Sequence, residues 1–237
     1  MVQAVVFDWF GTLAQWPDGP ASNYESIFLN HGHRIDPDVF ERYHSRWDGI
    51  DHAEHSTSRV AYLEWTRLRL SELAEDCGVP EGQRSALVDA IIDLDSQGPM
   101  VTFPETLAVL GELRQRGVAV GVCSNWGWDL DVALESTGVA PFVDVPVTSA
   151  RAGWRKPHPA IYEFMVSALD VAPSETVFVG DSWEPDVLGP ISAGMTSVHV
   201  CRDLTRSLPE LVAGSRRVTG LDQLFQLEVF AVGSEGP

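Results

Sequence analysis

Cysteine is scarce in this 237-residue chain. The three cysteines, Cys77, Cys123 and Cys201, are far apart and odd in number. They form neither the framework of a disulfide-stabilised secreted protein nor the close pairs of a zinc site. We therefore expect an intracellular protein and, by default, a cytoplasmic one.

Long apolar runs are also missing. No segment approaches the roughly 20 apolar residues that a membrane-spanning helix needs. The residues from Met1 to Asp8 contain no basic region and reach an acidic residue at once. We therefore expect neither a signal peptide nor a membrane as partner.

Positive charge is the third deficit. Lys and Arg together number 16 against 34 Asp and Glu, which gives a formal net charge of -18. This charge repels nucleic-acid phosphates and anionic lipids, so we expect no nucleic acid as a partner. A small anionic substrate remains compatible with it, because charge close to a site outweighs the distant field. The sequence leaves a homodimer open.

Short strand-like runs alternate with helical segments along most of the chain, which favours a parallel sheet flanked by helices. Between the runs, residues 104–116 carry Leu107, Leu110 and Leu113 on one face, which predicts a helix with a buried leucine face that stops at Gly117. The clearest runs are residues 3–8, 118–123, 143–147, 176–180 and 196–200.

The region from residue 15 to residue 97 interrupts this alternation. It contains no convincing strand but two amphipathic helical stretches, at about 57–77 and 85–94. In the first, an apolar stripe comprises Val60, Leu63, Leu70, Ala74 and Cys77. The sequence Gln97-Gly98-Pro99 is typical of a linker. We predict an α/β core formed by residues 1–14 and 98–237, with a helical second domain at 15–97.

Three polar segments follow strands or precede a helix. Asp8 ends the first run and is followed closely by Gly11-Thr12. An open parallel sheet binds ligands beyond the carboxyl ends of its strands, so Asp8 is placed to meet one. Ser124 and Asn125 end the second run, and Lys156 precedes a helix start after Pro157. Taken singly, each has a plainer explanation: a turn or capping aspartate, a serine turn and a solvated lysine.

A fourth segment, Gly180-Asp181-Ser182, ends another strand, and Asp186 follows it. Asp8, Asp181 and Asp186 would repel one another unless a cation joined them. Hard oxygen ligands suit Mg²⁺. With Lys156 added, three carboxylates face three positive charges, so the sequence predicts a magnesium site.

The order of these four segments resembles the signature of the haloacid dehalogenase-like (HAD) hydrolase superfamily, over residues 3 to about 200 without the insert. The resemblance implies a Rossmann-like α/β fold and identifies residues 15–97 as the helical cap of subclass I. It implies that Asp8 is the nucleophile and forms a covalent aspartyl intermediate. Ser124, Asn125 and Lys156 would bind the substrate, and Ser124 and Lys156 would also be catalytic.

The resemblance also implies the metal ligands. Mg²⁺ would be held by the carboxylates of Asp8 and Asp181 and by the backbone carbonyl of Phe10. Asp186 would bind it directly or orient its waters. The expected substrate is a small phosphorylated metabolite.

Phe10 departs from the pattern of the family's phosphatases, which have an acidic residue at that position to protonate the leaving group. General acid–base catalysis contributes about 10²–10⁴ in rate, so the loss is substantial. An aromatic residue there is similar to the 2-haloacid dehalogenases, whose halide leaves without a proton. Those enzymes work without metal, however, and have uncharged residues where this chain has Gly180-Asp181.

Three classes of function therefore remain: a Mg²⁺-dependent phosphatase, which the metal pattern favours, a haloacid dehalogenase, and a catalytically weak, binding-only member of the family. Substrate selectivity is expected to lie in the helical insert. Arg67, at the edge of the apolar stripe, is the best candidate for substrate binding there, although a snorkelling surface arginine explains it too. Most histidines of the insert lie in polar stretches typical of solvated surface.

Overall fold

A six-stranded parallel sheet forms the centre of the molecule, with the strand order β5-β4-β1-β6-β7-β8. The computed structural model describes residues 1–17, 23–97, 99–205 and 207–230. All five predicted strands are present. The strands are β1 (Ala4–Phe7), β4 (Ala119–Ser124), β5 (Val145–Thr148), β6 (Thr176–Gly180), β7 (Thr196–Val200) and β8 (Ser215–Val218).

The first strand lies at the centre of the sheet, between β4 and β6. Its side chains alternate between the two faces, as the pleat of a strand requires. Val5 and Phe7 pack into one hydrophobic core and Val6 into another. Because both faces are covered, the strand is apolar throughout rather than alternating with polar residues.

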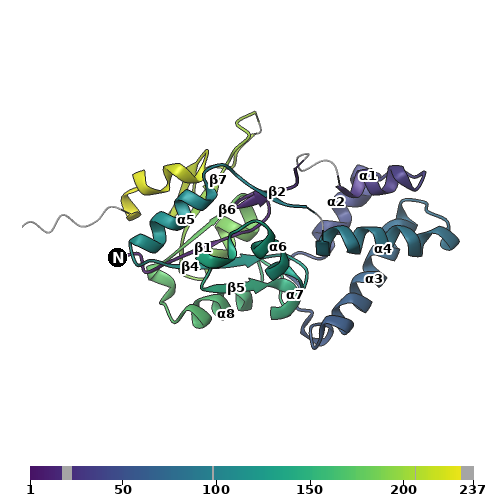
Figure 1. The fold of residues 1–237 in the computed structure, drawn as a ribbon, viewed down its shortest axis with the longest axis horizontal. Coiled ribbons are helices and arrows are strands. Elements are labelled where there is room, and N and C mark those ends of the chain that lie inside the picture. Colours follow the sequence, from purple (N-terminus) through teal and green to yellow (C-terminus); the bar gives the residue numbers. More distant parts are fainter. Residues whose placement is uncertain (18–22, 98, 206, 231–237) are drawn as a thin grey trace, which may run out of the picture.

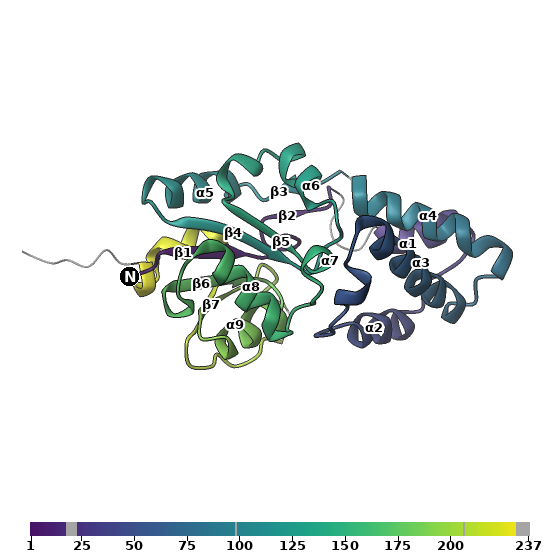
Figure 2. The same ribbon diagram turned by 90° about the horizontal axis from the view of Figure 1, so that it is seen from below.

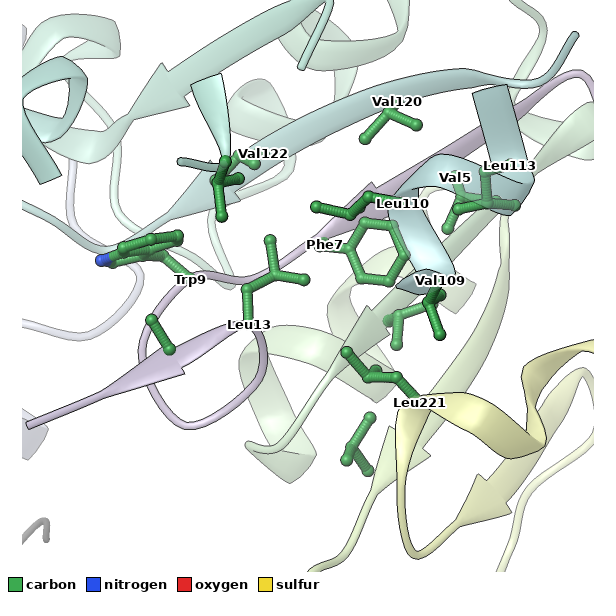
Figure 3. Packing of buried hydrophobic residues seen from close by; sticks show 14 of the residues in the cluster. Val5, Phe7, Trp9, Leu13, Val109, Leu110, Leu113, Val120, Val122 and Leu221 are labelled. Atoms are coloured by element: carbon green, nitrogen blue, oxygen red, sulfur yellow. The ribbon is translucent and has the colours of Figure 1, made fainter. Parts of the chain in front are cut away.

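Helices cover both faces of the sheet (Figures 1 and 2). On the face of Phe7 lie Leu110 and Leu113 of one helix and Leu221 of a later turn (Figure 3). That face carries α5 (Thr106–Gln115), α6 (Leu130–Ser136), η5 (Leu221–Gln226) and η6 (Glu228–Phe230). The opposite core contains residues of α8 (Pro159–Leu169), and the remaining short elements are η2 (Ala140–Phe142), α7 (Ser149–Ala152), η3 (Pro173–Glu175), η4 (Glu184–Leu188) and α9 (Gly189–Ser192).

The prediction that Leu107 shares the buried face of α5 is wrong. Its side chain is 39% exposed, whereas Val109, Leu110 and Leu113 are buried. A repeat of three residues drifts around a helix that has 3.6 residues per turn, so the first leucine turns toward solvent.

Four helices of the described residues form a separate helical unit. This unit lies at the end of the sheet (Figure 1). Its helices are α1 (Asn23–Asn30), α2 (Pro37–Arg46), α3 (Arg59–Asp76) and α4 (Glu81–Gln97), with the short turn η1 (Ala53–His55) before α3. Phe28, Leu70, Leu87 and Ile91 belong to a hydrophobic core of the unit's own. This separate core supports the predicted two-domain division, whose boundaries stay a prediction. Residues 18–22 and Gly98 of the predicted linker lie outside the described residues.

The buried stripe of α3 differs from the predicted one. Val60 is 65% exposed, and Leu63 and Cys77 are only partly buried. The buried side chains are Tyr62, Trp65, Arg69, Leu70, Leu73 and Ala74. An arginine therefore occupies the interior face of the helix. No helix in the described ranges combines the length and apolar character needed to cross a membrane.

Two of the contacts between the helical unit and the core are made through backbone hydrogen bonds. Strands β2 (Ala14–Gln15) and β3 (Val101–Thr102) pair antiparallel where the chain leaves and re-enters the core. The second contact joins residues 50–52 to residues 153–155. The backbone N–H of His52 donates to the Gly153 carbonyl at 2.7 Å, and that of Arg155 donates to the Ile50 carbonyl at 3.1 Å. We call this second contact the latch.

Gly153 is required at the latch for two reasons. Its φ of +86° is unfavourable for other residues, and a Cβ atom would lie 2.8 Å from Cα of Ala53. We predict that Gly153→Ala lowers the free energy of unfolding by about 2–4 kcal/mol. Gly117→Ala is the matched control, because Gly117 has a φ of +71° with nothing within 4 Å of its Cβ position. Equal losses in urea denaturation would show that the latch does not constrain Gly153.

Candidate functional site

The carboxyl ends of three adjacent strands place the predicted polar residues at one edge of the sheet. Asp8 follows β1, Ser124 ends β4, and Asp181 follows β6. Because β4 and β6 flank β1, residues far apart in sequence converge around Asp8. Oxygen atoms of Asp8, Asp181 and Asp186 lie within 4.8 Å of one another.

Lys156 lies between two of these carboxylates. Its Nζ donates to Oδ1 of Asp8 at 2.8 Å and to Oδ1 of Asp186 at 2.6 Å, and the side chain is 2% exposed. Burial alone would lower the pKa of Lys156, but Asp186 and Asp8 outweigh it and raise the pKa well above its ordinary value. The alternative of a solvated surface lysine is therefore excluded.

The single ammonium of Lys156 does not neutralise all three carboxylates. Burial and the nearby charges of Asp8 and Asp186 raise the pKa of Asp181 to about 7. Burial and Asp8 also raise the pKa of Asp186 to about 6, although Lys156 opposes this rise. Three carboxylates around one ammonium leave two negative charges uncompensated, which a divalent cation would balance.

The turn after β1 fits closely around Asp181. Oγ1 of Thr12 donates to Oδ1 of Asp181 at 3.3 Å. A Cβ atom on Gly11 would lie 2.6 Å from Oδ2 of Asp181, and the φ of Gly11 is +83°. Backbone hydrogen bonds in this turn use the Trp9 carbonyl and the Gly11 N–H, and none recorded in the described ranges uses the Phe10 carbonyl. That carbonyl is thus available as an oxygen ligand.

The side chain of Phe10 belongs to an aromatic cluster rather than to the acidic group. Its ring centroid is 5.9 Å from that of Trp16 and 6.3 Å from that of Trp126. An apolar wall therefore stands where the family's phosphatases have their acid.

Asn125 positions Lys156. Its Nδ2 donates to the Lys156 carbonyl at 2.9 Å, and its Oδ1 accepts from the Lys156 N–H at 2.7 Å. Both functional ends of the amide are thus engaged by the backbone, so the structure shows Asn125 holding the lysine. Ser124 is buried beside it at the end of β4.

Arg67 is not brought to the site. It lies on the outer surface of the helical unit, where NH1 forms an ion pair with Asp89 of α4. The neighbouring Arg69 points into the interior instead. The spacing of Tyr62, Trp65 and Arg69, three and then four residues apart, places them on one helix face. This spacing was the sequence signal that could have identified Arg69 as a residue of the buried face.

His52 differs from the expectation of solvated histidines, whereas His44 is exposed, as expected. His52 is 2% exposed, and burial followed by the charges of Arg155 and Arg69 lowers its pKa to about 4. Partial desolvation followed by the charges of the same two arginines lowers the pKa of His44 to about 4. Two arginines that sequence reasoning did not select thus add to the effect of burial at both histidines.

His199 of β7 supports Asp181 from outside the acidic group. Its Nε2 lies 3.0 Å from the Asp181 carbonyl, and its Nδ1 lies 3.2 Å from Nε of Arg217. Since arginine only donates, Nδ1 accepts and Nε2–H donates to the carbonyl. Sequence reasoning missed this pair because Arg217 belongs to the unpredicted strand β8.

A cavity of about 650 Å³ lies between the helical unit and the strand ends. Phe10, Asn125 and Trp126 line it from the core, next to the acidic group. Arg69 and His44 line it from the helical unit, and Arg155 from the latch.

Comparison with known proteins shows the relationship of most of the chain. The family model described as haloacid dehalogenase-like hydrolase matches residues 2–194. A phosphoserine phosphatase of Thermus thermophilus is 34% identical over 157 residues, which cover 66% of this chain and 61% of that relative. The match thus spans about three fifths of the relative's length.

Two further relatives are matched over most of their length. A ribulose-1,5-bisphosphate 5-phosphatase of Halopiger xanaduensis is 29% identical over 84% of each chain. The crystal structure of a 2-haloacid dehalogenase from Pseudomonas syringae pv. Tomato is 22% identical, covers 95% of this chain and 97% of that one, and superposes with a TM-score of 0.65. At that identity the likeness shows the shared fold.

The raised pKa of Asp181 predicts how its removal changes stability with pH. The folded protein binds the proton of Asp181 more tightly than the unfolded chain, so ionisation costs folding free energy as pH rises from about 4 to about 7. In EDTA, Asp181→Asn should therefore gain about 2 kcal/mol on the wild type between pH 5 and pH 8.

Urea denaturation of both proteins at four pH values measures this gain. The histidines with lowered pKa values contribute the opposite slope, but they are present in both proteins and cancel in the difference. A pH-independent difference would show that Asp181 titrates normally.

Proposed function

The chain belongs to the haloacid dehalogenase-like hydrolase family, and from this premise we propose that it is a Mg²⁺-dependent phosphatase acting on a small phosphorylated metabolite through a covalent intermediate on Asp8. The observation that carries the proposal is the charge of the buried group: Asp8, Asp181 and Asp186 surround a single ammonium, that of Lys156. In a hydrolase that used no metal, this fully ionised group, its nucleophile included, would carry two uncompensated negative charges.

The donor set fits Mg²⁺, which prefers hard oxygen ligands. The carboxylates of Asp8 and Asp181 and the free carbonyl of Phe10 would hold the ion, with Asp186 orienting its waters. When bound, Mg²⁺ supplies positive charge to the phosphoryl oxygens during transfer.

The other roles follow from the contacts of the chain's own residues. Lys156 fixes the Asp8 carboxylate through the 2.8 Å hydrogen bond, so one carboxylate oxygen remains to attack phosphorus. The new bond joins that oxygen to phosphorus while the bond to the leaving oxygen breaks. Ser124 and the ammonium of Lys156 would bind the phosphoryl oxygens, and water then hydrolyses the acyl phosphate.

The alternative is a haloacid dehalogenase, which the apolar wall of Phe10, Trp16 and Trp126 favours. A halide needs no proton to leave, so the missing acid would cost nothing. A substrate panel separates the two: phosphate esters and 2-haloacids, each with Mg²⁺ and with EDTA. Phosphate release that EDTA abolishes supports the proposal, halide release in EDTA supports the alternative, and activity on neither indicates a binding-only protein.

Removal of the nucleophile gives a sharp test of the covalent mechanism. Asp8→Asn should reduce turnover to below about 1%, because loss of a nucleophile costs several orders of magnitude. The metal-free variant should be at least as stable as the wild type, since one of three repelling carboxylates is gone. Steady-state kinetics and thermal melting in EDTA measure both. Higher residual turnover contradicts the mechanism, and a large loss of stability assigns Asp8 a structural role.

Phe10→Asp restores an acid where the family's phosphatases have one. For alkyl phosphates, whose alkoxide needs a proton to leave, kcat/KM should rise about 10-fold or more. Aryl phosphates should gain less, because phenolate leaves more easily. Under the dehalogenase alternative, the new charge enters an apolar halide pocket and activity on 2-haloacids falls. A folded variant that binds Mg²⁺ and gains on no phosphate ester would show that Phe10 is not the deficit.

A further inference from the structure

The cavity beside the acidic group is lined by aromatic rings from both parts of the molecule. Phe10, Trp16 and Trp126 stand on the side of the strand ends, with mutual centroid separations of 5.9–6.3 Å. Trp47 and Tyr62 face them from the helical unit. Such walls favour a flat, apolar ligand that stacks on them.

Arg69 brings a charge into this apolar surround without forming any of the recorded ion pairs of the described residues. Its side chain is only 7% exposed, and its guanidinium lies 3.8 Å from the ring centroid of Trp65 and 5.3 Å from that of Trp47. Its one hydrogen bond is to Oγ1 of Thr66 at 3.3 Å. Nε is buried with no partner, and no carboxylate of the described residues forms an ion pair with the guanidinium.

Arg155 also has an unpartnered Nε, although its side chain is only partly buried and Asp48 acts on its charge. Arg155 immediately precedes Lys156, it lines the cavity, and its buried Nε has no partner among the described residues. Burial lowers the pKa of Arg155, and the charge of Arg69 contributes to the lowering. His44 also lines the cavity, and after desolvation the charges of Arg155 and Arg69 contribute to its lowered pKa. Positive potential thus accumulates in the cavity of a chain whose net charge is -18.

None of the recorded ion pairs joins a carboxylate that lines the cavity to these arginines, although Asp95 partly offsets the charge of Arg69. Burial raises the pKa of Asp95 to about 6, and the charge of Arg69 opposes this rise. Asp95 accepts a hydrogen bond from the hydroxyl of Tyr24, and Asp129 pairs with Arg59. Glu25 and Glu41 are exposed to solvent. A guanidinium that is buried without an ion pair is costly, so an anionic ligand would be favoured beside Arg69 and Arg155.

We propose that the cavity binds the leaving group of the substrate, and that this group is an aromatic ring with a second anionic substituent, held by Arg69 and Arg155. The proposal rests on the phosphatase function proposed above. It names the substrate class as anionic aryl phosphates. The absence of an acid at Phe10 agrees with this class, because a phenol, with a pKa of about 10 like tyrosine, is expelled as phenolate without a proton donor.

A matched pair of substrates tests the second anionic group: 4-carboxyphenyl phosphate and its uncharged analogue 4-carbamoylphenyl phosphate. The amide withdraws electrons at least as well as the carboxylate, so leaving-group ability does not favour the charged compound. With Mg²⁺ present, kcat/KM of the wild type should favour the carboxylate by about 10-fold or more, as expected for a charge-assisted contact. A ratio near one overturns the proposal without any variant.

Variants then assign the preference to residues. Arg69→Gln and Arg155→Gln should each reduce the ratio to about 3-fold or less. Arg67→Gln is the matched control on the same helix, and its ratio should stay at the wild-type value. If Arg67→Gln lowers the ratio and Arg69→Gln does not, the assignment is wrong. Arg69→Met and Arg155→Met, which keep the apolar stem, serve where the glutamine variant fails to fold.

A binding measurement separates failure of this inference from failure of the phosphatase function. 4-Hydroxybenzoate should bind in the cavity and quench the fluorescence of the tryptophans that line it. The uncharged control, 4-hydroxybenzamide, should bind about 10-fold less strongly. Binding of 4-hydroxybenzoate without hydrolysis of any phosphate ester contradicts the proposed function alone. Hydrolysis of phosphate esters without preference for the anionic compound and without this binding contradicts the inference alone.

Discussion

The buried ion pairs of Lys156 with Asp8 and Asp186 are the interaction on which the site depends. A buried charge is tolerated only when it is paired and hydrogen-bonded, and breaking such a pair costs about 3–5 kcal/mol. Lys156 is the only lysine of the chain. Its ammonium joins Asp8, which follows β1, to Asp186 of η4, although most of the sequence separates the two residues. Any arrangement of the strands that moved one of these two carboxylates would remove one of the two ion-pair partners of the buried ammonium.

The segment that carries Lys156 also joins the two parts of the molecule. Asn125 fixes its backbone from the core side, and the latch fixes residues 153–155 from the side of the helical unit. Arg155 belongs to the same segment and lines the cavity. Docking of the helical unit, position of the lysine and shape of the cavity therefore depend on one short stretch of backbone. A displacement of the helical unit would therefore shift Lys156 relative to Asp8.

The sequence was informative where a residue type is tied to strand order. Asp8, Ser124 and Asp181 converge because parallel strands end at one edge, and this follows from apolar runs that stop at polar residues. It was uninformative where position depends on rotation or on an edge. Strand β8 was missed because its two arginines make it unlike a buried strand, as befits the sheet edge. Arg67 was preferred to Arg69 because an apolar stripe defines the buried face of α3 only to within a residue or two.

The replacement of an acid by Phe10 and the positive cavity have a common physical consequence. Without a proton donor, selectivity for good leaving groups is imposed by the chemistry itself, so the binding energy of the cavity is free to recognise the leaving group. Under the proposed function, the aromatic walls and the guanidinium groups of Arg69 and Arg155 would recognise a flat anion. The acidic group would bind a metal ion and a phosphoryl group instead. Phe10 contributes to both regions, because its backbone belongs to the turn that follows Asp8 and its ring lines the cavity.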